Sequence, residues 1–269
     1  KWPRHEWIFF ELAELSNMII NKKKIAVYRL FFLAIILFLW TVMSIKLGSY
    51  VIPSPSQTFY AARRMLAEGR LSVALWESLT VYLIGYFFAV LIAVPLGFFM
   101  GAFNVIGKTL DIFVFALSAT PRVAFIPLII ILLGLGVEAK VFIVFLGAII
   151  PILINSYAGI LAADQELVEM AKSVGASRTG IFFSIVLPGA FPYVMIGLRL
   201  GATIGLINTV VAELYTAING LGGLLALYGN TFRMAEYFVV VIMLALVGVA
   251  ITEGLKLIEN RFKIFYGSR

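Results

Sequence analysis

Cysteine and histidine, two of the side chains that most often carry out chemistry in proteins, are nearly absent from this sequence. Its 269 residues include no cysteine and a single histidine, His5, close to the first residue. Disulfides, thiolate nucleophiles and cysteine-based zinc sites are therefore excluded. A serine–histidine pair within the apolar segments is excluded as well, and no cluster of acidic residues has the spacing of metal ligands. The sequence predicts no catalytic residue, no metal site and no cofactor bound by this chain.

One segment resembles a phosphate-binding loop but does not have its spacing. Residues 101–109 read GAFNVIGKT, with five residues between the two glycines. The phosphate-binding motif has four residues there and follows a β-strand, whereas this segment follows a long apolar run. ATP hydrolysis is therefore not expected of this chain, and any ATP and Mg²⁺ would be bound by a partner chain.

A few residues interrupt apolar sequence and could line a path for a solute. They are Pro121 and the polar residues Arg122, Asn208 and Glu213. An ionised side chain inside a membrane is costly, so it usually faces water, a cavity or an opposite charge. Arg122 fits an attractor for an anion, because Pro121 and Pro127 would loosen a helix and free backbone carbonyls. It also fits a side chain that extends to the membrane surface, or one that pairs with a buried acid such as Glu213.

The composition places these residues in a membrane. Hydrophobic residues make up 62% of the chain and charged residues 13%, against roughly 45–50% and 25% in soluble domains. A soluble fold of this size could not cover its surface with so few polar groups. A soluble enzyme, a nucleic-acid-binding protein and a disordered regulator are thereby excluded. The net charge of +7 fits Lys and Arg residues held on the cytoplasmic side.

Six apolar segments are long enough to cross a bilayer as helices, since about 20 residues span its hydrocarbon core. We therefore predict an all-α integral membrane protein with six transmembrane helices. The expected spans are residues 25–47, 76–103, 112–133, 141–161, 190–211 and 237–258.

The first span is predicted to be a retained anchor, because its apolar core is too long for a secretory signal. Before it, residues 1–24 carry a stripe of apolar side chains at helical spacing, which fits an interfacial helix on the cytoplasmic surface or a loosely packed terminal helix. Residues 25–269 would form the membrane domain. With the N-terminus in the cytoplasm, the inner connections carry about twice as many Lys and Arg residues as the outer ones. This bias predicts that both termini are cytoplasmic.

Three connections are long. The first outer one, residues 48–75, contains Pro53 and Pro55 and a predicted amphipathic helix from Thr58 to Glu68, and the second outer one, residues 212–236, is rich in glycine and fits a partly re-entrant segment. The inner one, residues 162–189, is polar enough to lie in water.

Within the inner connection, Asp164 is a plausible N-cap for a first helix, and Gly175 permits the reversal that ends it. A second helix is expected from Ser177 to Val186, with Leu187-Pro188 breaking it before the next span. Two short helices around a glycine turn fit a docking surface for another protein. They also fit an amphipathic connector that lies on the lipid headgroups.

Small residues recur at helical spacing in two spans. Gly197, Gly201 and Gly205 form a double small-xxx-small pattern, and Gly97 and Gly101 form a single one. Such patterns permit close contact between helices in a membrane. The contact could lie between two copies of the chain or within one copy.

The inner connection resembles the EAA motif of ATP-binding-cassette (ABC) importer permeases. That motif reads E-A-A, three residues, G, nine residues, I-x-L-P, and this chain has Glu169-Met170-Ala171, Gly175 and Ile185-Val186-Leu187-Pro188 at the same spacing. Met170 replaces the usual alanine. Other segments are similar to the nitrate, sulfonate and taurine type of these permeases, among them Ile52-Pro53-Ser54-Pro55, Val94-Pro95-Leu96-Gly97 and Gly197-Leu198-Arg199.

This resemblance implies a type I ABC importer permease in a bacterial inner membrane. A homodimer of the chain would work with two ATPase subunits and an extracytoplasmic solute-binding protein, surrounded by lipid and without nucleic acid. The inner connection would be the coupling helix that sits in a cleft of the ATPase. The solute would be a small anion such as a sulfonate, taurine, nitrate or bicarbonate. The coupling residues implied are Glu169, Met170, Ala171, Gly175, Ala176, Ser177, Arg178, Leu187 and Pro188.

Two other functions fit the sequence less well. An autonomous secondary transporter or channel usually needs several intramembrane carboxylates or an inverted repeat. Here only Glu213 and Glu253 stand near span ends, and no repeat is visible. An intramembrane enzyme would lack its catalytic groups. Binding of an ATPase to the chain would separate the importer from both alternatives.

Overall fold

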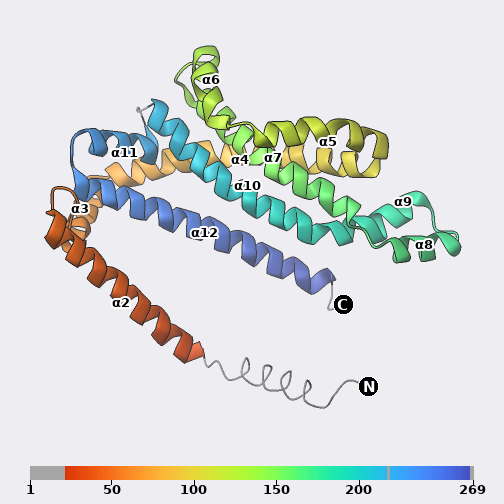
Figure 1. Ribbon diagram of the computed structural model, residues 1–269, viewed down its shortest axis with the longest axis horizontal. Helices are drawn as coiled ribbons and strands as arrows, with labels where there is room; N and C mark the ends of the chain where they lie inside the picture. The colour runs from red at the N-terminus through yellow and green to blue at the C-terminus, as the bar shows by residue number, and fades with distance from the viewer. Residues whose placement is uncertain (1–21, 217–218, 267–269) are drawn as a thin grey trace.

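The computed structural model describes residues 22–216 and 219–266, with side chains from 24 to 261 inside those ranges, and all regular structure in these parts is helical (Figure 1). The predicted helix within residues 1–24 lies almost wholly outside the described residues. The elements in chain order are α2 (Lys22–Leu47), α3 (Pro55–Ala67), α4 (Arg70–Ala102), α5 (Asn104–Ala119), η1 (Arg122–Phe125), α6 (Ile126–Leu133), α7 (Val137–Leu161), α8 (Gln165–Ser173), α9 (Arg178–Ile181), η2 (Phe182–Val186), α10 (Leu187–Thr216), α11 (Gly220–Asn230) and α12 (Met234–Tyr266).

Five helical stretches among the described residues are each long and apolar enough to cross a membrane. They cover residues 24–47, 70–102, 137–161, 178–216 and 234–261. Their places agree with five of the six predicted spans, with ends that extend by several residues. The all-α fold with apolar helices long enough to cross a membrane is therefore confirmed for the described ranges, which contain five or six candidate spans depending on how the remaining segment is counted.

The remaining segment is the predicted span 112–133, which does not form one straight helix. Residues 104–119 and 122–133 form two helical arms that meet at an angle of 84°. The cause is local: Thr120 has an extended backbone, with φ −78° and ψ 130°. Proline at position 121 disfavours helical geometry in the residue before it and has no N–H to continue the helix. The hydropathy of the sequence does not predict this change of direction.

Helix α7 lies at the centre of the fold, with its most extensive contacts to α4 and α10 (Figure 1). Of the apolar span windows, that of α7 is the most buried, at 44%. Its apolar residues Ala148, Ile152 and Leu153 form one core with Ala89, Ala93 and Met100 of α4.

Glycines hold α4 and α10 close to α7. A Cβ atom added to Gly97 of α4 would stand 2.8 Å from the Leu153 carbonyl oxygen, and one added to Gly201 of α10 would stand 3.0 Å from that of Ala148. Backbones approach this closely only where no side chain intervenes. The small-residue patterns therefore serve contacts within one chain, which decides between the two alternatives that the sequence left open.

Helix α2 makes few contacts with the rest of the chain, and only 6% of its apolar window is buried. It diverges from the other helices and meets them at its C-terminal end (Figure 1). There the Trp40 indole N–H donates to the Pro53 carbonyl at 2.8 Å, and its ring stacks on Phe238 of α12 with centroids 5.8 Å apart.

The predicted amphipathic helix is α3, which begins at Pro55, three residues earlier than expected. Ser54 starts it with a capping box: its hydroxyl accepts from the Gln57 N–H, and the Gln57 side chain accepts from the Ser54 N–H. At the other end of the helix, Arg64 forms an ion pair with Glu236 of α12, which also binds Arg233 at 2.6 Å. The shared carboxylate fixes α3 to the start of α12.

Candidate functional site

The inner connection folds as two short helices that project from one end of the molecule (Figure 1). Asp164 caps α8 as expected, because its Oδ1 accepts from the N–H groups of Glu166 and Leu167 at 2.9 and 3.2 Å. Val168 is the buried residue of this helix, whereas Glu169 and Met170 are exposed. The outward face of α8 therefore presents a carboxylate next to an uncovered apolar side chain, with Met170 61% exposed.

The spacing of the EAA-like motif has a structural cause in the way α8 ends. Gly175 has a φ of +80°, a backbone conformation that glycine adopts without strain. Its N–H donates to the Lys172 carbonyl and the Ala176 N–H donates to the Ala171 carbonyl, each at 3.0 Å. This is the hydrogen-bond pattern of a Schellman C-cap. The alanine and the glycine of the motif therefore belong to one helix-terminating turn: Ala171 provides an acceptor carbonyl and Gly175 provides the positive φ.

The chain after this turn re-enters a helix, and here one expectation is wrong. Ser177 is the N-cap of α9, with its hydroxyl accepting from the Gly180 N–H at 3.1 Å. Leu187-Pro188 was predicted to break the second helix, yet the helix runs on as one apolar stretch from Arg178 to Thr216. The reason is the π-helical turn η2, in which the Leu187 N–H donates to the Phe182 carbonyl five residues back. Pro188, which has no N–H, directly follows this π-helical turn.

Two of the candidate pathway residues converge on one glycine of α7. The Arg122 Nη1 donates to the Gly147 carbonyl at 2.8 Å. From α10, Asn208 fills the space beside Gly147, where a Cβ would stand 1.9 Å from the Asn208 amide nitrogen. Pro121 precedes Arg122 at the bend between α5 and α6. Arg122, Asn208 and the bend are therefore brought together at the middle of α7.

Glu213 lies apart from this group and does not pair with Arg122. Its carboxylate is buried, with the residue 1% exposed. Both oxygens accept from the Ser78 hydroxyl at 2.8 Å, and Oε2 also accepts from the Gly222 N–H at 2.8 Å. The alternative in which Arg122 pairs with Glu213 is thereby wrong, and a role for Glu213 in lining a path for a solute stays a prediction.

The partners of Glu213 complete a cap for α11 that comes from other helices. The first N–H groups of a helix have no partner within it, and Asn219 at the N-cap makes no side-chain hydrogen bond. Instead the Gly220 N–H donates to Glu77 at 2.9 Å, and the Leu221 N–H donates to the Ser78 hydroxyl at 2.8 Å. With Gly222 bound to Glu213, three successive amides are satisfied by α4 and α10.

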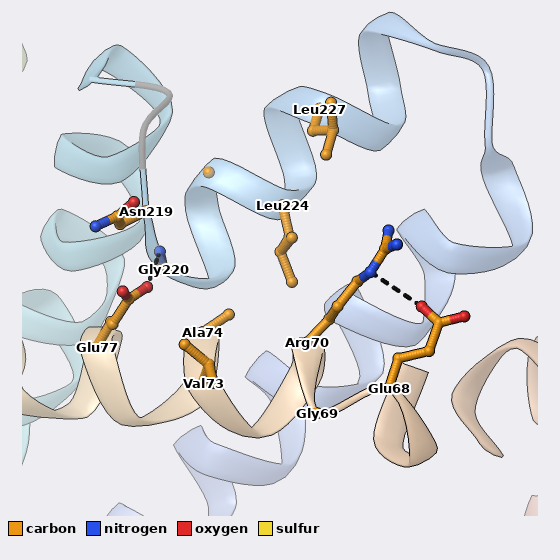
Figure 2. A pocket seen from close by; sticks show the side chains of 11 residues that line it. Glu68, Gly69, Arg70, Val73, Ala74, Glu77, Asn219, Gly220, Leu224 and Leu227 are labelled. Carbon is orange, nitrogen blue, oxygen red and sulfur yellow. Dashed lines mark hydrogen bonds and ion pairs between the residues drawn. The ribbon is translucent and has the colours of Figure 1, made fainter. Parts of the chain in front are cut away.

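A groove of about 610 Å³ lies between the start of α4 and α11, beside this cap (Figure 2). Glu77 reaches across it to Gly220, and at its other end Arg70 binds Glu68 at 2.9 Å (Figure 2). Between these charged residues its apolar lining comes from Val73, Ala74, Leu224 and Leu227. Among the described residues no group of acidic or histidine side chains could hold a metal ion.

Sequence reasoning missed Glu77, Ser78, Gly147 and Pro151. Glu77 and Ser78 stand at the start of an apolar span. An acidic residue beside a hydroxyl residue at such a position can accept hydrogen bonds from the first N–H groups of another helix, and this pair could have been recognised from the sequence on that ground. Pro151 stands four residues after Gly147 within α7, a spacing that leaves one carbonyl without its helical donor.

The fold is that of an all-helical protein with several helices long and apolar enough to cross a membrane, and comparison with known proteins identifies its class. The family described as "Binding-protein-dependent transport system inner membrane component" matches residues 93–263. The chain therefore belongs to this family, the membrane permeases of ABC transport systems.

Its relatives include permeases named for taurine and for aliphatic sulfonates. The chain is 29% identical over 234 residues, 85% of each sequence, to the taurine transport system permease protein TauC of Escherichia coli. It is 38% identical over 154 residues, 57% of this chain and 58% of the relative, to the putative aliphatic sulfonates transport permease protein SsuC of the same organism. A putative ABC transporter permease, MJ0413 of Methanocaldococcus jannaschii, is 33% identical over 182 residues, 67% of this chain and 68% of that protein.

A solved structure supports the fold. The chain resembles a chain of the MetNI methionine ABC transporter in an inward-facing conformation, with a TM-score of 0.59 and 22% sequence identity. The match covers 73% of this chain and 98% of the other.

Proposed function

We propose that this chain is the translocation subunit of an ATP-driven importer, and that residues 162–189 couple it to a separate ATPase. The observation that carries the proposal is the exposed face of α8 beside its Schellman turn. Glu169 offers a charge and Met170 an apolar contact on a helix that projects beyond the spans. A connector that only joined two spans would need neither the projection nor the capped ends.

The remaining coupling residues follow from the same geometry. Ala171, Gly175 and Ala176 hold the turn, while Ser177 starts the helix that leads through Arg178, Leu187 and Pro188 into α10. Motion of the ATPase would be transmitted along this continuous helix, which packs closely on α7. ATP and Mg²⁺ would be bound by the ATPase, and the chain itself would be non-catalytic.

The assembly proposed is a homodimer of this chain in the bacterial inner membrane. It would bind two ATPase subunits and, on the extracytoplasmic side, a solute-binding protein. The bare apolar surface of α2 supports a second copy or lipid against that helix. The solute proposed is a small anion such as a sulfonate, taurine, nitrate or bicarbonate. The names of the relatives and the position of Arg122 support that class, with Pro121 and Asn208 as neighbouring pathway residues.

A pull-down tests the coupling site. The chain is extracted from native membranes in mild detergent, captured, and the eluate is assayed for ATPase activity. A Glu169→Arg/Gly175→Trp double variant should lose the co-purified activity at least about tenfold, because a reversed charge and a strained turn both disturb the α8 surface. The matched control is Glu138→Arg/Gly48→Trp, which changes another exposed glutamate and another glycine with positive φ away from α8.

The control should retain the wild-type ATPase activity. Equal loss in both double variants would show a general folding defect and remove the support for a coupling site. No ATPase with the wild-type chain in several detergents would favour an autonomous transporter or channel.

Cysteine labelling tests the proposed orientation, with both termini and residues 162–189 in the cytoplasm. The chain has no native cysteine, so Tyr50→Cys and Val174→Cys each provide one thiol at a site that is 89% or 82% exposed. A membrane-impermeant maleimide added to cells with a permeabilised outer membrane should label Tyr50→Cys alone. After disruption of the inner membrane both variants should be labelled. Labelling of Val174→Cys in intact cells would reverse the proposed topology.

A further inference from the structure

Helix α7 contains a carbonyl that its own backbone cannot satisfy. In an α-helix each carbonyl accepts from the N–H four residues later. The residue four positions after Gly147 is Pro151, which lies inside α7 and has no N–H. The Gly147 carbonyl therefore needs a donor from elsewhere or stays unpaired inside the membrane, where an unsatisfied backbone group is costly.

The donor comes from the bend between α5 and α6. Arg122 is the first residue of η1, at the point where the two arms meet at 84°. Its guanidinium reaches the Gly147 carbonyl at 2.8 Å. A charged donor makes a stronger hydrogen bond than a neutral one, especially where water is scarce.

We propose that Arg122 fastens the α5–α6 bend to α7 by supplying the hydrogen-bond donor that Pro151 removes from the helix. The bend and the middle of α7 then move as one body. Arg122 is in this sense a positioning residue, and the inference holds whether or not the chain transports an anion.

The surroundings of Gly147 favour this attachment. Asn208 of α10 occupies the place where a side chain at position 147 would stand, and its own amide donates to the Ile204 carbonyl at 3.0 Å. Asn208 thus packs against the glycine without competing for its carbonyl. The apolar residues Ile126 and Ile129 of α6 pack with Ile143 of α7 near the same point, so the arginine adds a polar fastening to an apolar contact.

A double-mutant cycle on the full chain in detergent tests the proposal. Arg122→Met should lower the melting temperature by about 5 °C, because it leaves the Gly147 carbonyl unpaired. Pro151→Ala restores a backbone N–H at position 151, which can donate to the same carbonyl. In the Pro151→Ala background, Arg122→Met should therefore lower the melting temperature by less than half as much. If Arg122→Met alone does not fold, recovery of folding in the double variant supports the proposal.

The matched control is Pro95→Ala, which removes a proline from the interior of α4. Arg122→Met should cost as much in that background as in the wild type. Equal costs in the Pro151→Ala and Pro95→Ala backgrounds would overturn the proposal, as would failure of both Arg122→Met and the Pro151→Ala double variant to fold.

A spectroscopic measurement separates fastening of the bend from general stability. Spin labels on Phe113→Cys of α5 and Ile131→Cys of α6, residues that are 62% and 79% exposed, report the distance between the two arms. Double electron–electron resonance should give a narrow distance distribution for the otherwise unchanged chain and a broader one for Arg122→Met and for Pro151→Ala. Combining the two changes should broaden it no further, since both remove the same fastening. A distribution that stays narrow in Arg122→Met would overturn the proposal.

Discussion

The Gly97→Val variant will not assemble its central helices. A Cβ atom at position 97 would stand 2.7 Å from Ser156 Cβ, 2.8 Å from the Leu153 carbonyl oxygen and 2.9 Å from the Tyr157 backbone nitrogen. Two of these atoms belong to the backbone of α7 and cannot rotate away, so α4 and α7 would have to separate. We expect a loss of at least about 3 kcal/mol, enough to leave little folded chain.

Size-exclusion profiles and melting temperatures in mild detergent measure this effect. Gly254→Val is the matched control, because Gly254 is also helical and a Cβ there would meet no atom within 4 Å. The control should elute and melt like the wild-type chain. A Gly97→Val variant with the wild-type melting temperature would show that α4 does not approach α7 as closely as described.

The second large effect is expected at Glu213. Replacing it by alanine leaves the buried Ser78 hydroxyl and the Gly222 N–H without their acceptor. Each buried polar group left unpaired costs roughly 1–3 kcal/mol, so we expect a loss of about 3 kcal/mol. The N-terminal end of α11 should then detach from α4 and α10.

Hydrogen exchange of the α11 amides measures that detachment. Exchange at residues 220–222 should accelerate by about 100-fold in Glu213→Ala, which corresponds to the loss of stability at that helix end. Glu213→Gln keeps one acceptor oxygen and should exchange at an intermediate rate. Glu253→Ala removes a carboxylate whose side chain is 60% exposed and should leave these amides unchanged. Protection of α11 that survives in Glu213→Ala would show that the cap does not hold it.

Much of the fold follows from the hydropathy of the sequence. The features that hydropathy does not predict are the bends within an apolar segment and the choice of which helices contact one another. The length of an apolar run predicts a span but not a bend, so Thr120-Pro121 turned the expected third span into two arms. Asp164 and Gly175 could be read correctly, because capping and a positive φ are local requirements. Leu187-Pro188 could not, because the missing N–H of proline predicts a helix break, whereas the chain continues through the π-helical turn that precedes Pro188.

The contacts between helices were the least predictable part. The glycines of α4 and α10 predicted close packing between helices. Their common partner could not be predicted, because α7 contacts them through Ala148, Ile152 and Ser156 and not through a glycine pattern of its own. The Gly147 carbonyl is a backbone group, so no side-chain motif marks it as the acceptor of Arg122. The cap of α11 joins residues more than 130 positions apart, and only the folded chain brings them together.

The central position of α7 also affects the order in which helices can pack during biosynthesis. Helix α4 is complete at Ala102, but α7 is complete only at Leu161, about 60 residues later, or roughly 3–12 s at ordinary rates of translation. Throughout that delay Gly85, Gly97 and Gly101 present bare backbone to lipid or to the insertion machinery. Helix α10, the other neighbour of α7, emerges later still. Ribosome speed between these helices therefore decides how long a newly inserted α4 can associate with a wrong neighbour.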